Sequence, residues 1–312
     1  MPAPSYMRLL PRETLSKIGG LELLARGMVE GFVAGRHRSP HKGFSVEFAE
    51  HRAYTPGDDL RNFDWRVLAR TDRRYIRQYV EETNMRVTIL LDASGSMAYA
   101  GDAAAPSPAG GAPLSKFDYA RHIAAALAYL LVNQQDAVGM AVFDDKLRSR
   151  YPARCRASQV RLLLEELDRA EPGGETSIAP IFHDMAERIP RRGMVVVLSD
   201  LFDDPDAILN ALHHFRHRRH EVLLFHVMAD EELHFPFKEF TGFDDLERPG
   251  EPLRADPRAI RASYLETVNA FLRKLKTGCG QMKIDYVPLN TSTPYDLALA
   301  DYLTRRRAMP RA

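Results

Sequence analysis

The chain has 312 residues, of which 45% are hydrophobic and 27% charged, and its formal net charge is +1. This composition is typical of a folded globular protein with one large or two modest domains. A net charge so close to zero provides no global attraction to nucleic acid or to an anionic membrane. No apolar run is long enough to span a bilayer, and the N-terminus lacks the apolar segment of a signal peptide. Two widely separated cysteines, Cys155 and Cys279, predict reduced thiols in a cytoplasmic protein.

The first quarter of the chain is predicted to form a separate extension over residues 1–83. Apolar residues at helical spacing predict a helix over residues 12–33, and residues 35–43 are interpreted as a solvated basic loop. Alternating patterns predict strands over residues 44–48 and 75–80. Between them, acids and arginines surround the only tryptophan of the chain: Asp58, Asp59, Arg61, Asp64, Trp65 and Arg66. We interpret this cluster as an ion-pair network that attaches the extension to the next domain, with a docking surface as the alternative.

Residues 86–97, RVTILLDASGSM, combine a predicted buried strand with a polar loop. The apolar run ends in Asp92, and Ser94 and Ser96 follow at alternate positions. Ligands of open α/β sheets bind at the carboxyl ends of the strands, where these three oxygen-bearing side chains are expected. An oxygen-only ligand set suits a hard cation, with Mg²⁺ preferred and Mn²⁺ or Ca²⁺ as alternatives. The motif by itself is equally compatible with a strand that ends in an ordinary polar turn.

Strand and helix patterns alternate from residue 84 to residue 307. Two segments interrupt the alternation: residues 100–113, interpreted as a tolerated surface insertion, and residues 233–257, interpreted as a small hairpin or loop. The repeated units predict an α/β fold with a doubly wound, mostly parallel sheet and helices on both faces. Strands are predicted over 87–91, 137–143, 146–151, 194–198, 221–228 and 282–288, and helices over 116–132, 159–167, 178–189, 205–217, 258–276 and 294–307.

Two further oxygen-bearing residues are predicted at the same end of this sheet. Thr176 lies in the segment PGGETS just before a predicted helix, where it can serve as an N-cap or as a metal ligand. Asp200 follows the apolar run 194–198, with Ser199 between them. Together these positions predict a metal site formed by side chains from three loops: Asp92, Ser94, Ser96, Thr176 and Asp200.

This arrangement resembles the von Willebrand factor A-like fold and its metal-ion-dependent adhesion site. The family pattern places Asp-x-Ser-x-Ser after the first strand, a threonine in a later loop and an aspartate after the fourth strand, and the three pieces occur here in that order. The segment EHRAYTPGDDLRNFDWRVLAR before DASGSM, with LSDLFD later, is also similar to the bacterial domain-of-unknown-function family fifty-eight.

The resemblance implies a non-enzymatic, Mg²⁺-dependent protein-binding module over residues 84–307, with a short tail at 308–312. In it, Ser94 and Ser96 would bind the ion directly, Thr176 directly or through water, and Asp92 and Asp200 would supply charge. A partner's Asp or Glu would complete the coordination. Relatives of this family are often found with MoxR-type AAA+ ATPases, which makes such an ATPase the implied partner in assembly or maturation of other proteins.

Two other interpretations compete with a binding module. A metal-dependent hydrolase or phosphatase could use Asp92 and Asp200, but no histidine lies beside the motif as a general base and no Walker A sequence occurs. His213, His217 and His220 are spaced for one helix face and raise the question of a zinc site. A solvated basic helix face is the favoured interpretation, because the neighbouring arginines repel a cation.

Overall fold

The computed structural model describes residues 9–11, 14, 46–55, 63–81, 85–107, 113–189, 192–248, 250 and 252–308. The chain divides into two compact units, one formed by Met1–Ala34 with Met85–Ala312 and the other by Gly35–Asn84. Most of the helix predicted over 12–33 lies outside the described residues, as do the basic segment 35–43 and the side chains of Asp58, Asp59 and Arg61.

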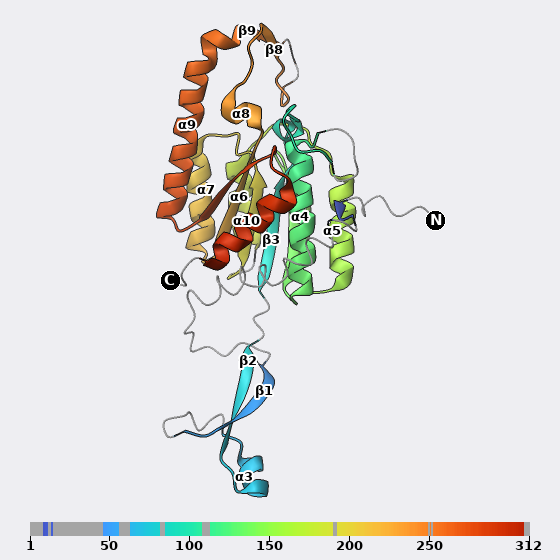
Figure 1. Ribbon diagram of the computed structural model, residues 1–312, viewed down its shortest axis with the longest axis vertical. Helices are drawn as coiled ribbons and strands as arrows, with labels where there is room; N and C mark the ends of the chain where they lie inside the picture. Colours follow the sequence, from blue (N-terminus) through green and yellow to red (C-terminus); the bar gives the residue numbers. More distant parts are fainter. Residues whose placement is uncertain are drawn as a thin grey trace, which may run out of the picture. The chain divides into compact units, whose positions relative to one another are not determined.

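The large unit is built on a six-stranded sheet with the order β10-β7-β6-β3-β4-β5 (Figure 1). Numbered along the chain within this sheet, the order is 3-2-1-4-5-6, which is the order of doubly wound folds. All neighbouring strands are parallel except β4 and β5, which pair antiparallel at one edge. The predicted α/β fold with a mostly parallel sheet is therefore confirmed. The strands are β3 (Arg86–Asp92), β4 (Ala137–Phe143), β5 (Leu147–Arg154), β6 (Met194–Ser199), β7 (Glu221–Met228) and β10 (Asp285–Asn290).

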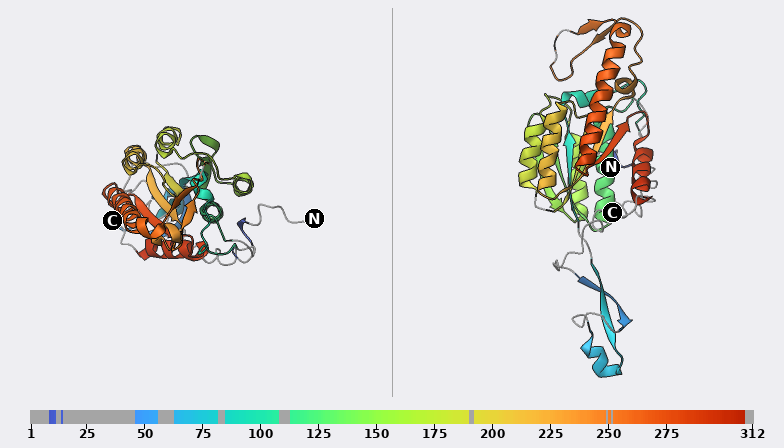
Figure 2. Two further views of the ribbon diagram at one scale, coloured as in Figure 1. Left: turned by 90° about the horizontal axis from the view of Figure 1, so that it is seen from above. Right: turned by 90° about the vertical axis from the view of Figure 1, so that its left-hand side faces the viewer.

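Helices cover both faces of this sheet, as the view from above in Figure 2 shows. One face packs against α4 (Lys116–Asn133), α5 (Ala157–Arg169) and α10 (Tyr295–Ala308). The other packs against α6 (Ile178–Arg188), α7 (Pro205–His217) and α9 (Pro257–Gln281). Successive side chains of a strand point to opposite faces of the sheet. The apolar side chains of β3 are therefore buried in both cores, as expected for a central strand of a parallel sheet.

Two predicted interruptions of the alternation have definite structures. Residues 233–257 contain the antiparallel pair β8 (Thr241–Phe243) and β9 (Leu253–Ala255), preceded by the short helix α8 (Asp230–His234). The hairpin prediction is therefore confirmed. The described part of residues 100–113 is not a loose surface insertion, because Ala104 and Ala105 are buried. The Ala105 amide also donates to the carbonyl oxygen of Thr291 at 2.8 Å, which ties this segment to the end of β10.

The small unit contains the antiparallel strands β1 (Val46–Ala53) and β2 (Tyr75–Glu81), joined by a segment that includes helix α3 (Trp65–Thr71). The helix was not predicted. Asp64 is its N-cap, because its carboxylate accepts hydrogen bonds from the backbone amides of Arg66 and Val67 at 3.0 and 3.1 Å. Trp65 is 62% exposed, and its ring lies 4.6 Å from that of Phe63. The contacts described for Asp64 thus give it a helix-capping role within this unit.

Candidate functional site

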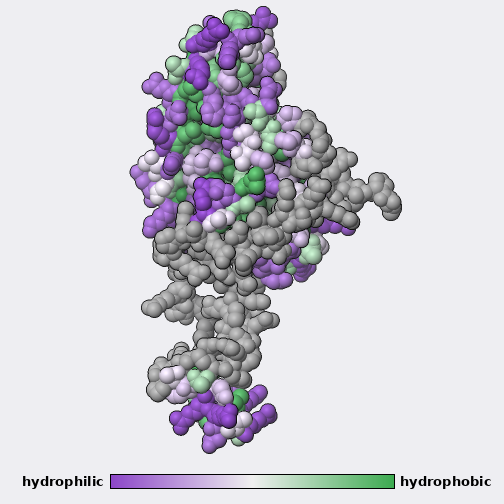
Figure 3. Space-filling model, viewed as in Figure 1, coloured by the Kyte–Doolittle hydropathy of each residue, from purple (hydrophilic) through white to green (hydrophobic). Residues whose placement is uncertain are grey.

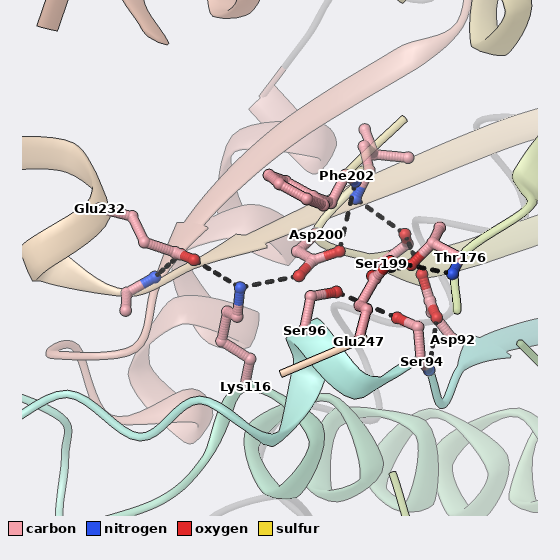
Figure 4. A network of polar contacts seen from close by, with 12 residues as sticks. Asp92, Ser94, Ser96, Lys116, Thr176, Ser199, Asp200, Phe202, Glu232 and Glu247 are labelled. Carbon is pink, nitrogen blue, oxygen red and sulfur yellow. Dashed lines mark hydrogen bonds and ion pairs between the residues drawn. The ribbon is translucent and has the colours of Figure 1, made fainter. Parts of the chain in front are cut away.

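Asp92 is the buried centre of a polar network at the carboxyl end of β3 (Figure 4). Its Oδ1 atom accepts from the backbone amide of Ser94 at 2.9 Å, and its Oδ2 atom accepts from the Ser199 hydroxyl at 2.5 Å. Burial, together with the nearby charge of Asp200, raises the pKa of Asp92 to about 7, although the hydrogen bonds oppose this rise. Two buried acids therefore lie close together at this end of the sheet, and their proximity disfavours the charged form of Asp92.

The loop after Asp92 presents two hydroxyl groups side by side. Ser94 precedes the 3₁₀-helix η3 (Gly95–Ala98), and its side chain makes no capping bond to that helix. Instead, the Ser94 and Ser96 Oγ atoms lie 3.1 Å from each other. Ser94 is buried and Ser96 is half-buried, so both hydroxyls are held at the inner wall of the loop.

Strand β6 lies next to β3, and the second acid of the network, Asp200, is the residue that follows it. Asp200 is followed by Leu201, which has a left-handed backbone with a φ of 55° although it is not a glycine. The Leu201 amide donates to the Ser199 hydroxyl at 2.9 Å, which fixes this turn.

His226 supports the same turn from strand β7. Burial lowers the pKa of His226 to about 4, so the imidazole is neutral near pH 7. Its Nε2 atom lies 2.9 Å from the Asp200 carbonyl oxygen, which can only accept, so Nε2 carries the proton. Nδ1 then accepts from the Tyr286 hydroxyl at 2.7 Å. This histidine orients the backbone and is not placed as a general base.

Lys116, at the first turn of α4, inserts a buried positive charge beside Asp200. Its Nζ atom lies 2.7 Å from Asp200 Oδ2 and 2.6 Å from Glu232 Oε1. Burial alone would lower the pKa of Lys116, but the carboxylates of Asp200 and Glu232 raise it above its usual range. Asp200 therefore has an ion-pair partner within the chain, whereas Asp92 is bound by neutral donors only in the contacts described.

Thr176 reaches the network on a loop that is clamped to the first one. The Gly95 amide donates to the Gly174 carbonyl oxygen, and the Gly173 amide donates to the Ala93 carbonyl oxygen, both at 2.9 Å. Gly174 adopts a φ of 84°, which an L-residue with a side chain rarely takes. These contacts place Thr176 beside the Asp92 loop, where Figure 4 shows it among the labelled side chains.

Glu247, from the segment between β8 and β9, completes the set. Its carboxylate accepts hydrogen bonds from the Thr176 hydroxyl and from the Thr176 backbone amide, the latter at 3.2 Å. In Figure 4 its side chain extends into the same group as Ser94 and Ser96. Glu247 thus reaches the network from the segment between β8 and β9, outside the alternation of strands and helices.

The structure places the five predicted residues at one end of the sheet, between the neighbouring strands β3 and β6 and the loop before α6. Four participants were missed by the sequence reasoning: Lys116, Ser199, Glu232 and Glu247. Ser199 stands directly before Asp200 and could have been included. The other three belong to segments distant in sequence, and no local sequence pattern predicts that these segments contact the site. Within the described residues no group of three or more His, Cys, Asp or Glu side chains has metal-ligand geometry. The oxygen-bearing side chains at this site include several hydroxyl groups, which such a group does not count.

The fold and the site define an α/β protein with a polar cluster at the switch point of a doubly wound sheet, the usual ligand position in this class. The chain belongs to the family described as "Protein of unknown function DUF58", whose pattern matches residues 50–271. Curated relatives include uncharacterized proteins of Mycobacterium bovis and Mycobacterium tuberculosis, each 28% identical over 219 residues, or 69% of this chain. The chain spans 65% of the length of these relatives.

Two solved structures are similar to this chain at low sequence identity. A conserved hypothetical protein, BatB, from Bacteroides thetaiotaomicron is 18% identical, with a TM-score of 0.45 over 71% of this chain and 98% of that chain. An aerotolerance-related membrane protein from Bacteroides fragilis is also 18% identical, with a TM-score of 0.41 over 71% of this chain and 99% of that chain.

Other sequence predictions have mixed outcomes. Across the described part of the chain, no helix has both the length and the apolar character needed to cross a bilayer. The cytoplasmic location stays a prediction. The prediction that His213, His217 and His220 share one helix face is wrong. Helix α7 ends at His217, and His220 is buried after the end of the helix. Cys155 and Cys279 are both free thiols.

Proposed function

We propose that this protein is a Mg²⁺-dependent protein-binding module, with the ion held at the carboxyl ends of β3 and β6. The observation that carries the proposal is the pair of hydroxyl groups on Ser94 and Ser96, whose Oγ atoms lie 3.1 Å apart. Neighbouring ligands of an octahedral Mg²⁺ at its usual bond lengths are about 2.9 Å apart, so this spacing fits the ion. Thr176 and Asp200 lie at the same edge of the sheet and can contribute directly or through water.

The charge distribution supports a cation at this position. Asp92 is fully buried beside a second acid, and burial and that acid disfavour its charged form. A divalent cation at this position would favour the charged form of Asp92. It would also supply an electrophilic centre for an oxygen ligand. Ser94 and Ser96 would hold the ion without neutralising it. Asp92 would fix the loop through its bonds to the Ser94 backbone amide and the Ser199 hydroxyl.

The same contacts favour binding over catalysis. Asp92 is 0% exposed and both its oxygens accept hydrogen bonds, so it is not available as a nucleophile. His226 faces the Asp200 backbone and Tyr286, not an open position. A hydrolase or phosphatase that used Asp92 and Asp200 would need an accessible base or nucleophile. We therefore favour capture of a partner's carboxylate.

Calorimetric titration of Mg²⁺ into the wild-type chain and two matched variants tests the metal site. Asp92→Asn keeps the shape of the side chain but removes its charge, and we expect it to weaken Mg²⁺ binding by about 10- to 100-fold. Asp136→Asn removes another buried acid, remote from the site, and leaves the affinity unchanged. Equal Mg²⁺ affinity in wild type and Asp92→Asn would refute the metal site.

The proposed partner is a protein that offers an Asp or Glu side chain, and the family resemblance makes a MoxR-type AAA+ ATPase the first to test. Pull-down of that ATPase with the immobilised chain should succeed in Mg²⁺ and fail in EDTA. The double substitution Ser94→Ala, Ser96→Ala should abolish it as EDTA does. Capture that is indifferent to both treatments would exclude a metal-mediated contact.

A further inference from the structure

The segment Asp244-Asp245-Leu246-Glu247-Arg248, which we call the acidic strap, brings an internal carboxylate to the site. It lies between β8 and β9, in a hairpin drawn above the carboxyl end of the sheet in Figure 1. Glu247 accepts from both the side chain and the backbone amide of Thr176. Thr176 is one of the residues proposed to hold the metal, so this internal acid stands where an external one would be expected.

The strap is seated directly on the loop that carries Ser94 and Ser96. A Cβ atom added to Gly95 would lie 2.3 Å from the Leu246 carbonyl oxygen and 3.0 Å from the Gly174 carbonyl oxygen. Contacts this short to backbone atoms require something to move. Three segments therefore meet at Gly95, and the absence of a side chain there lets the strap approach.

Two further sets of bonds shape and hold the strap. The Asp245 Oδ1 atom accepts from the backbone amides of Glu247 and Arg248 at 2.9 and 3.1 Å, which forms a local turn. The Arg248 guanidinium donates to both carboxylate oxygens of Glu175, at 3.0 and 2.8 Å. Arg248 and Glu175 are both exposed, so this two-bond ion pair, which we call the latch, is a weak contact accessible to solvent.

Glu247 brings a further carboxylate into a network that already contains acids (Figure 4). Asp92 and Asp200 already lie in the network, and Lys116 directs its charge to Asp200 and Glu232. Together with Asp92, Asp200 and Glu232, Glu247 makes four carboxylates in this network. A divalent cation bound by Ser94 and Ser96 would attract the carboxylate of Glu247.

We propose that Glu247 is the chain's own ligand for the metal site, and that the acidic strap must be displaced before a partner's carboxylate can bind. This inference rests on the proposed function. The strap also indicates the chemistry of the partner: an acid that follows an exposed apolar residue, as Glu247 follows Leu246. Leu246 is 42% exposed and Phe202, two residues after Asp200, is 68% exposed. Green patches among purple in Figure 3 show that this upper part of the unit exposes apolar as well as polar side chains.

Water-proton relaxation with bound Mn²⁺ tests the strap on the full chain. Mn²⁺ replaces Mg²⁺ and reports how many exchangeable waters it carries. Glu247→Ala should gain about one metal-bound water per ion relative to wild type, because one ligand of the octahedron is removed. Added acetate should then lower the relaxation enhancement of Glu247→Ala and leave that of wild type unchanged. Glu239→Ala, which removes an exposed acid from the same insert, should behave as wild type.

The outcomes separate the inference from the function on which it rests. Equal hydration and equal acetate response in wild type and Glu247→Ala would overturn the strap and leave the metal site standing. Loss of all Mn²⁺ binding in Glu247→Ala alone would show that Glu247 is a permanent ligand, which overturns its displacement. Absence of saturable Mn²⁺ binding in every variant would overturn the metal site and the strap together.

Discussion

Asp92 and Asp136 are buried acids at opposite ends of one sheet, and they differ in what surrounds them. Burial raises the pKa of each to about 7. Asp136 precedes β4 and accepts a hydrogen bond from the Met85 amide at 2.9 Å, just before β3 begins. Asp92 ends β3, accepts from the Ser94 amide and the Ser199 hydroxyl, and lies beside a second acid, Asp200. A perturbed pKa is thus common to both ends, whereas convergence of polar groups from several segments marks only one.

The comparison shows how a doubly wound sheet separates stability from function. At the amino end of the sheet, Asp136 accepts a hydrogen bond from the Met85 backbone amide, and the chain then enters β4. At the carboxyl end, β3 and β6 are neighbours whose connections leave in opposite directions, so their loops part and leave room for side chains. The following predictions test this difference, from the largest expected effect to the smallest.

Lys116→Met should produce the largest loss of stability. The substitution keeps the length of the side chain but leaves Asp200 and Glu232 without their buried cation, which typically costs about 3–5 kcal/mol. Urea unfolding in the absence of metal measures the change. Lys274→Met is the matched control, because its ion pair with Asp206 is exposed and contributes less than about 1 kcal/mol. Equal effects of the two substitutions would show that the buried ion pairs of Lys116 contribute no more to the free energy of unfolding than the exposed pair of Lys274.

Asp136→Asn should stabilise the protein more as the pH rises. The pKa of Asp136 is raised from 3.8 to about 7, so the folded state binds the proton more tightly and wild type loses stability as the pH rises through this window. Between pH 5 and pH 8 the advantage of the variant should grow by about 2–3 kcal/mol. Urea unfolding of both proteins at the two pH values measures it. A constant difference would mean that Asp136 titrates alike in the folded and unfolded states.

Arg248→Ala should have the smallest effect on overall stability and a local effect on the acidic strap. Its fork to Glu175 is exposed, so the urea midpoint should hardly change. Amide hydrogen exchange of residues 244–248 should accelerate by about two- to fivefold, because the latch no longer holds the segment. Arg254→Ala, at an exposed position in β9, serves as the control. Unchanged exchange in Arg248→Ala would show that Glu247 and the Gly95 contact hold the strap alone.

Much of the large unit follows from local pattern. The strands β4 and β7 and the helix α7 have the predicted limits, and α4 extends the predicted helix by one residue. Apolar runs bounded by polar residues suffice there because these elements are buried on both faces or along one side. The prediction fails where tertiary contacts decide: β10 begins at Asp285 instead of residue 282, since α9 continues to Gln281. Helix α3 was missed, although Asp64 is a recognisable N-cap residue.

The sequence alone determined the alternation of strands and helices, and with it the edge of the sheet to which Asp92, Ser94, Ser96, Thr176 and Asp200 belong. Only the tertiary structure decided what else reaches that edge. Lys116 arrives from the start of a helix and Glu247 from a hairpin inserted 71 residues after Thr176. The physical reason is that periodicity records which face of an element is buried, while the meeting of distant loops depends on strand order and on close approaches such as that at Gly95.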